Sequence, residues 1–166
     1  MIFVGIDPGI NATGVVAIDG EARGGKVVHQ EIVMGIKPTK QKRFDPVRVE
    51  SMASAVLEAV VRAEDFGNGL LVVAIEEPFV GASASGALKQ YSVFVTIALD
   101  VRNGWDDILI VAPTTLKKFV GAKGKKNLMA RQVYKKWGYE ADDDNLTDAY
   151  AIARWAEHEY NNAPKV

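Results

Sequence analysis

Asp7 is a carboxylate that interrupts an apolar part of the sequence. It ends the apolar segment 2–6 and stands directly before a Pro-Gly turn. An acid in this position often only accepts hydrogen bonds from nearby amides. It could also hold Mg²⁺ or Mn²⁺, which prefer carboxylate oxygens. The role of Asp7 therefore depends on whether other acids reach the same place.

A pair of glutamates, Glu76 and Glu77, ends the continuous apolar run 70–75. A charge at the end of a covered strand is costly unless it is paired or holds a metal. Successive side chains of a strand point to opposite faces, so only one of the two glutamates can share a site with Asp7. We favour Glu76.

The third group of acids lies in segment 142–148, before the apolar stretch 149–153. Capping of a helix N-terminus explains Asp144 without any catalytic role. Asp148 is one turn further inside, and Asp144 and Asn145 would project beside it. Acids from three distant segments that converge would suit two divalent ions about 4 Å apart, which activate water and stabilise a leaving oxygen. The pattern favours phosphoryl chemistry.

The net charge of −1 hides a separation of charge along the chain. Segment 108–139 contains no Asp or Glu and eight bases, namely Lys117, Lys118, Lys123, Lys125, Lys126, Arg131, Lys135 and Lys136. Such a block is commonly only a solvated surface. Beside a carboxylate cluster it favours contacts to a phosphate backbone.

Hydrophobic periodicity predicts the elements that must position these residues. We expect strands at 2–6, 14–18, 26–33, 70–75 and 108–112, and helices from 45–46 to near 66–67 and at 83–101, 113–119, 126–137 and 144–159. The order β-β-β-α-β-α-β followed by helices predicts one α/β domain over residues 1–166. The three acidic places can converge only if the last helix lies against the sheet.

Composition excludes several classes of chemistry. Without cysteine there is no disulfide, thiolate metal site or cysteine nucleophile, so a metal would be held by oxygen ligands or by His29 and His158. No basic leader precedes Asp7 and no apolar run approaches the roughly 18 residues of a membrane span. We expect a soluble, unprocessed cytoplasmic protein with no membrane partner.

Four short motifs occur in a fixed order over nearly the whole chain. They are Phe-Val-Gly-Ile-Asp-Pro-Gly at 3–9 with Thr13-Gly14, Ala-Ile-Glu at 74–76 followed by Phe79, Leu-Lys-Lys-Phe-Val-Gly at 116–121, and Asp-Ala-Tyr-Ala-Ile-Ala at 148–153. In this order they resemble the RuvC-type Holliday junction resolvases, including the shorter phage versions.

The resemblance implies an RNase H-like fold with a five-stranded mixed sheet flanked by helices, and a Mg²⁺- or Mn²⁺-dependent endonuclease that acts on branched DNA with two ions per site. It implies that Asp7 bridges the metals, that Glu76 binds one, and that Asp148 and a helix neighbour complete the set. The family often has an acid where this chain has Asn145, so either Asp144 or Asn145 would take that role. Residues implied to contact DNA are Phe79, Lys117, Lys118, Lys123, Lys125 and Lys126.

The resemblance also implies a homodimer, and the predicted helix 83–101 is the candidate interface. Its apolar residues spread around more than one face, whereas a helix packed only on its own sheet needs a single stripe. The alternative is that the chain's own C-terminal helices cover the second face.

Three other functions remain open from the sequence. The turn after Asp7 also resembles the first phosphate loop of actin-like and sugar-kinase-like nucleotide-binding proteins. A non-catalytic binder of branched DNA could keep the fold and the lysines. A less specific flap or RNA–DNA hybrid nuclease could use the same carboxylates.

Overall fold

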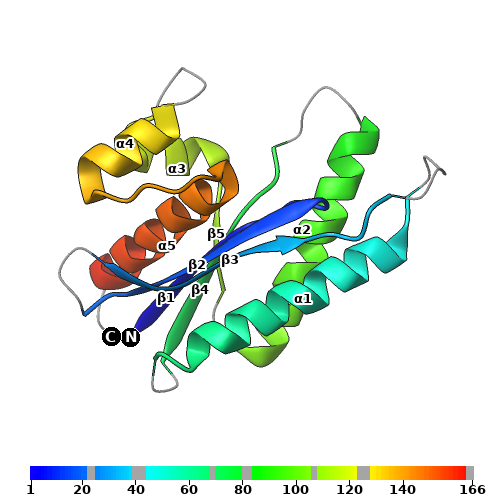
Figure 1. The fold of residues 1–166 in the computed structure, drawn as a ribbon, viewed down its shortest axis with the longest axis horizontal. Helices are drawn as coiled ribbons and strands as arrows, with labels where there is room; N and C mark the ends of the chain where they lie inside the picture. The colour runs from blue at the N-terminus through cyan, green and yellow to red at the C-terminus, as the bar shows by residue number, and fades with distance from the viewer. Residues whose placement is uncertain are drawn as a thin grey trace.

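A computed structural model describes residues 1–21, 25–38, 44–67, 70–79, 84–105, 108–122 and 128–163. Five strands and five helices lie within these ranges (Figure 1). The strands are β1 (Ile2–Asp7), β2 (Ala12–Asp19), β3 (Lys26–Met34), β4 (Leu71–Glu76) and β5 (Ile108–Val111). The helices are α1 (Pro46–Glu64), α2 (Ala84–Gly104), α3 (Pro113–Val120), α4 (Leu128–Trp137) and α5 (Asp144–Asn162).

The strands form one mixed sheet in the order β3-β2-β1-β4-β5. β1, β2 and β3 form an antiparallel meander, whereas β1 pairs with β4 and β4 with β5 in parallel. β4 is therefore covered by a strand on each side, which agrees with its continuous apolar sequence. The predicted element order and sheet class are confirmed.

The sheet separates two hydrophobic cores (Figure 1). Helices α1 and α2 cover one face, where Ile2, Val4 and Ile6 of β1 point. Helix α5 covers the other face, with α3 and α4 beside it, and Phe3 of β1 points there. Alternation along β1 thus assigns even residues to the α1 face and odd residues, including Asp7, to the α5 face.

Local sequence signals account for where the helices begin. Asp45 caps α1, because its Oδ1 accepts a hydrogen bond from the Val47 amide at 3.1 Å and a proline occupies the first turn. The ends were harder to predict: α2 extends to Gly104 and α5 to Asn162, three residues beyond each expected end. Residues 126 and 127, expected to begin α4, lie outside the described ranges.

The outward face of α2 is not covered by the C-terminal helices. Helices α3, α4 and α5 lie on the opposite face of the sheet (Figure 1), which contradicts the alternative that they bury this surface. Leu88, Val95 and Leu99 remain 60%, 45% and 53% exposed. No helix within the described ranges has the length and apolar character needed to cross a membrane.

Candidate active site

Asp7 and Glu76 end two neighbouring parallel strands on the same face. Ile6 of β1 pairs with Ile75 of β4, so the next residue of each strand, Asp7 and Glu76, lie side by side at the carboxyl edge. Val72 and Ala74, which share a face with Glu76, belong to the core beneath α5. The prediction that Glu76 faces the same side as Asp7 is confirmed.

Glu77 belongs to the other face of the sheet. The hydroxyl of Tyr91 in α2 donates a hydrogen bond to Glu77 Oε1 at 3.4 Å, and α2 lies on the side opposite α5. The two adjacent glutamates therefore face different surroundings, and Glu77 provides a control for any test of Glu76.

Two glycines allow α5 to approach the sheet closely enough to bring Asp148 to the strand ends. A Cβ at Gly5 would collide with the Ala149 carbonyl oxygen, and one at Gly14 would collide with the Asn145 carbonyl oxygen. Gly14 pairs with Asp7 across the β1–β2 ladder. The first turns of α5 therefore lie directly over the end of β1.

Asp143, rather than Asp144, is the N-cap of α5. Its Oδ1 accepts a hydrogen bond from the Asn145 amide at 2.8 Å, and its backbone is extended. Asp144 is therefore not the N-cap, but it lies in the first turn of α5, where its charge meets the N-terminal end of the helix dipole as expected. The run of three aspartates at 142–144 contains several residues suited to capping, so the sequence could not select one.

The electrostatics of the carboxylates show that three of them come together. Burial, followed by repulsion from Asp148, Glu76 and Asp143, raises the pKa of Asp7 well above its ordinary value. Burial and the negative charge of Asp148 raise the pKa of Glu76 to about 7. Burial and the charge of Asp144 raise the pKa of Asp148 to about 6. We define Asp7, Glu76 and Asp148 as the acidic cluster.

Lys117 lies beside the acidic cluster, since its charge lowers the pKa of both Glu76 and Asp148. It is exposed on α3. Lys118 is also exposed but does not contribute to these shifts. The sequence predicted the same role for Lys117 and Lys118, whereas in the structure only Lys117 acts on the pKa values of the acidic cluster.

The structure places both candidates for the fourth ligand near the acidic cluster. Asp144 is exposed in the first turn of α5, and its charge acts on Asp148. Asn145 is half-buried, and its backbone and Cβ lie against Gly14. The choice between Asp144 and Asn145 stays a prediction.

The donor set of the acidic cluster fits a divalent cation. Several half-buried carboxylates that repel one another are stabilised when a cation binds, and Mg²⁺ and Mn²⁺ prefer oxygen ligands. Among the described residues, no group of three or more acidic or histidine side chains is already arranged to hold a metal ion. The cluster supplies the chemistry of a metal site, and its side chains would have to close around the ion.

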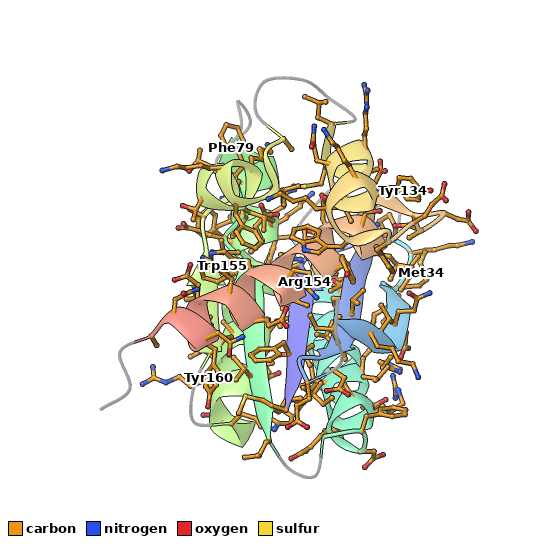
Figure 2. All side chains as sticks on the ribbon, turned by 90° about the vertical axis from the view of Figure 1, so that its left-hand side faces the viewer. Met34, Phe79, Tyr134, Arg154, Trp155 and Tyr160 are labelled. Carbon is orange, nitrogen blue, oxygen red and sulfur yellow. The ribbon has the colours of Figure 1, made fainter. Side chains whose placement is uncertain are left out.

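Of the residues expected to contact DNA, Lys117 lies beside the acidic cluster, and Lys118 follows it on α3. Phe79 follows β4 three residues after Glu76 and is 72% exposed. Figure 2 shows it near the upper end of the molecule, far from Tyr160 of α5. Lys123, Lys125 and Lys126 lie outside the described residues.

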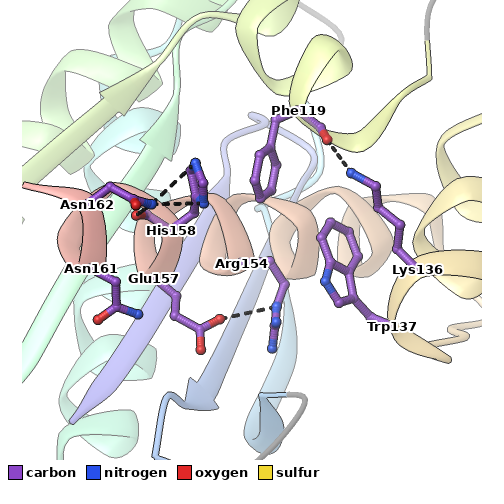
Figure 3. A pocket seen from close by; sticks show the side chains of 8 residues that line it. All are labelled: Phe119, Lys136, Trp137, Arg154, Glu157, His158, Asn161 and Asn162. Atoms are coloured by element: carbon purple, nitrogen blue, oxygen red, sulfur yellow. Dashed lines mark hydrogen bonds and ion pairs between the residues drawn. The ribbon is translucent and has the colours of Figure 1, made fainter.

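An open groove of about 510 Å³ is lined by Phe119 of α3, by Lys136 and Trp137 of α4, and by residues 154–162 of α5 (Figure 3). Many of its polar groups contact one another: Lys136 Nζ donates to the Phe119 carbonyl, Arg154 pairs with Glu157 at 3.2 Å, and Asn162 donates to the His158 carbonyl at 2.6 Å. Phe119 and Trp137 lie 5.7 Å apart between their ring centroids. The groove lies between α3, α4 and α5, and no member of the acidic cluster lines it.

The chain has the RuvC-type variant of the RNase H-like fold. A structure of Thermus thermophilus RuvC in complex with Holliday junction substrate superposes with a TM-score of 0.72 at 19% sequence identity, covering 98% of this chain and 96% of that one. A second Thermus thermophilus RuvC structure gives a TM-score of 0.70 at 24% identity, with 96% and 94% covered.

A more distant similarity is to the yeast mitochondrial Holliday junction resolvase. Its TM-score is 0.54 at 15% identity, with 95% of this chain and 82% of that one covered. No protein-family model and no curated protein sequence matches the chain. The fold implied by the four motifs is confirmed.

Proposed function

We propose that this protein is a divalent-metal-dependent endonuclease that resolves four-way DNA junctions. The observation that carries the proposal is the meeting of Asp7, Glu76 and Asp148 at the carboxyl edge of β1 and β4, beneath α5. The fold in which they meet is that of RuvC, and one of the similar structures holds a Holliday junction.

The acidic cluster would hold the metal, with Asp144 or Asn145 as its fourth member. When bound, Mg²⁺ or Mn²⁺ supplies charge stabilisation and an activated water for phosphodiester hydrolysis. The carboxylates of Asp7, Glu76 and Asp148 would be its ligands. Lys117 keeps Glu76 and Asp148 more readily ionised, since its charge lowers the pKa of both.

The surroundings of the acidic cluster suit a DNA backbone. The described residues of helices α3 and α4 include no acid. Their bases are Lys117, Lys118, Arg131, Lys135 and Lys136. Such side chains neutralise phosphates and release counterions. The exposed ring of Phe79, close in sequence to Glu76, could stack on a base opened at the junction.

A homodimer would provide the second active site that paired nicks require. One acidic cluster can cut one strand at a time, whereas a four-way junction has two-fold symmetry. The exposed face of α2 offers the interface, with Leu88, Val95 and Leu99 at helical spacing. Phe44, which precedes α1 and is 44% exposed, lines a groove together with Val95 of α2 and extends this apolar surface.

The alternatives from the sequence have less support. Actin-like and sugar-kinase-like proteins enclose the nucleotide between two such domains, whereas the described residues of this chain form a single five-stranded sheet. A non-catalytic DNA binder has no need for half-buried carboxylates that repel one another, since their burial costs free energy. A flap or hybrid nuclease of the same fold is distinguished by substrate preference.

The test is a cleavage assay with purified protein and Mg²⁺ on labelled four-way junction, flap, linear duplex and RNA–DNA hybrid of matched sequence. We expect cutting of the junction at least about tenfold faster than the others. Equal or faster cutting of the flap or the hybrid would replace junction resolution by the corresponding nuclease activity. No cutting of any substrate with Mg²⁺ or Mn²⁺ would overturn the proposal.

A further inference from the structure

The turn that follows Asp7 is held from the side of the sheet opposite the acidic cluster. Three polar or charged side chains are buried among the described residues, namely Thr13, Arg48 and Thr147. Thr147 lies in the first turns of α5, and its hydroxyl donates to the Asp143 carbonyl at 3.3 Å. The other two contact the turn between β1 and β2 directly.

Thr13 closes the turn internally. Its hydroxyl donates to the Gly9 carbonyl at 2.9 Å and accepts from the Gly9 amide at 3.1 Å. The same oxygen lies 3.3 Å from the sulfur of Met52 in α1. A single buried hydroxyl therefore fixes the backbone two residues after Asp7.

Arg48 ties the far end of this turn to two other elements. Its Nη2 donates to Asn11 Oδ1 at 2.9 Å, and its Nε donates to the Ile36 carbonyl at 2.8 Å. The Asn11 carbonyl in turn accepts from the Gly35 amide at 2.8 Å. The guanidinium thus joins α1, the β1–β2 turn and the chain after β3.

The partners of Arg48 are neutral although the residue is only 9% exposed. None of the ion pairs among the described residues includes Arg48. A buried cation without a carboxylate is costly unless its donors are hydrogen-bonded in good geometry. The two short hydrogen bonds satisfy that need and fix the position of Asn11.

Arg48 and the acidic cluster lie on opposite faces of the sheet. Arg48 belongs to α1, which packs on one face of the sheet, whereas Asp7 points to the face that α5 covers. The charged groups that shift the pKa of Asp7 are Asp148, Glu76 and Asp143, and no cation is among them. Any effect of Arg48 on the site passes through the backbone of the turn.

We propose that Arg48 is a positioning residue for the acidic cluster, and that its hydrogen bond to Asn11 fixes the backbone beyond Asp7. This inference rests on the proposed function. Displacement of a catalytic group by about 1 Å can cost on the order of 100-fold in rate. The hydrogen bond that Arg48 makes to the turn after Asp7 can therefore affect the cleavage rate although Arg48 does not contact the acidic cluster.

The test compares Arg48→Met, Arg48→Lys and Asn11→Ala with Arg62→Met, which removes an exposed arginine from the same helix. The measurements are Mn²⁺ binding without DNA by electron paramagnetic resonance, hydrogen exchange of amides 9–13, metal-free junction affinity, and single-turnover cleavage. Lysine keeps the charge but not the two-pronged geometry, so Arg48→Lys should behave like Arg48→Met.

We expect Arg48→Met and Asn11→Ala to lower the cleavage rate by about 10- to 100-fold and to weaken Mn²⁺ binding. Hydrogen exchange at amides 9–13 should become faster, while the metal-free junction affinity stays unchanged. Arg62→Met should match the wild type in all four measurements. The double variant should be no worse than Arg48→Met, because both remove the same contact.

Normal Mn²⁺ binding and exchange in folded Arg48→Met would overturn the inference, and lost metal-free junction affinity would make Arg48 a DNA contact instead. If Arg48→Met does not fold, Asn11→Ala decides, because Asn11 lies in an exposed turn. Wild-type protein that cuts no junction would refute the proposed function alone. Mn²⁺ binding and hydrogen exchange would still test whether Arg48 positions the acidic cluster.

Discussion

At the scale of single residues, the carboxylates of the acidic cluster repel one another, and a bound cation or a proton relieves that repulsion. The pKa values of Glu76 and Asp148 lie near 7 and 6, so both carboxyls take up protons in the folded protein more readily than in an unfolded chain. Raised pKa values of this kind are typical of functional sites. They also separate these acids from the surface acids of the chain.

Neutral substitutions in the acidic cluster should abolish cleavage without abolishing binding. Asp7→Asn, Glu76→Gln and Asp148→Asn each remove charge needed in the transition state, so we expect at least about a 100-fold loss of rate. Junction affinity should be unchanged or tighter, because less negative charge faces the phosphates. Glu77→Gln is the matched control, since Glu77 contacts Tyr91 on the other face. An inactive Glu77→Gln beside an active Glu76→Gln would refute the assignment.

The pH dependence of cleavage should report Glu76 and Asp148. Their raised pKa values mean that the protonated, non-ligating forms persist up to about pH 6 to 7, so cleavage at limiting Mg²⁺ should rise as pH increases through this range. Since Lys117 lowers both pKa values, Lys117→Met should move the rise to higher pH.

Lys118→Met provides the comparison for Lys117→Met, because Lys118 does not act on either pKa. It should leave the pH profile in place and reduce the salt dependence of junction binding by about one unit of slope for each lost phosphate contact. Identical pH profiles for wild type and Lys117→Met would remove Lys117 from the acidic cluster. Unchanged affinity and salt slope for Lys118→Met would make that lysine part of a solvated surface.

At the scale of elements, much of the architecture could be predicted from the sequence. Period-two and period-3.6 patterns gave the order of strands and helices, and alternation along β4 separated Glu76 from Glu77. These signals are local. The predicted ends of α2 and α5 were three residues short, because the apolar periodicity stops before the stop signals Gly104 and Pro164.

Contacts between distant segments could not be predicted in the same way. The collision of a Cβ at Gly5 with Ala149 and the hydrogen bond from Arg48 to Asn11 each depend on how two elements pack. Periodicity identifies the face of a helix but not its distance from a sheet. The acidic cluster was predictable because its members border apolar runs, whereas the residues that hold it in place carry no such signal.

The packing of α5 on the sheet should control the acidic cluster. Gly14→Ala places a methyl group against the Asn145 backbone, so α5 must move away from Asp7 or the sheet must distort. Overpacking of this kind costs about 1–3 kcal/mol, and thermal denaturation should show it at about 2–4 °C per kcal/mol. The cleavage rate should fall by more than the loss of folded protein accounts for. Gly104→Ala is the control, since no atom lies within 4 Å of its Cβ; equal effects of both would contradict the account.

At the scale of the whole molecule, the two faces of the sheet have different tasks in the proposed resolvase. The α5 face carries the acidic cluster and the bases of α3 and α4. The α2 face carries exposed apolar side chains that no described helix covers. This division would allow two copies to associate through α2 while both acidic clusters remain open to DNA.

Dimerisation through α2 should therefore depend on its exposed apolar residues. A Leu99→Glu substitution buries a charge in the proposed interface and should convert a dimer into a monomer in sedimentation at micromolar concentration. Val61→Glu serves as the control, because Val61 is 48% exposed on α1, comparable with 53% for Leu99. A wild-type monomer that stays monomeric on junction DNA would contradict the dimer.

The most direct test of junction resolution is the product of cutting a supercoiled plasmid that extrudes a cruciform. Two active sites acting within one complex cut both strands before release, so the account predicts linear plasmid as the early product, dependent on Mg²⁺ and absent with Asp148→Asn. Nicked circles that accumulate first and become linear only through a second, independent binding event would contradict paired resolution. Equal cutting of a plasmid without the cruciform would contradict junction specificity.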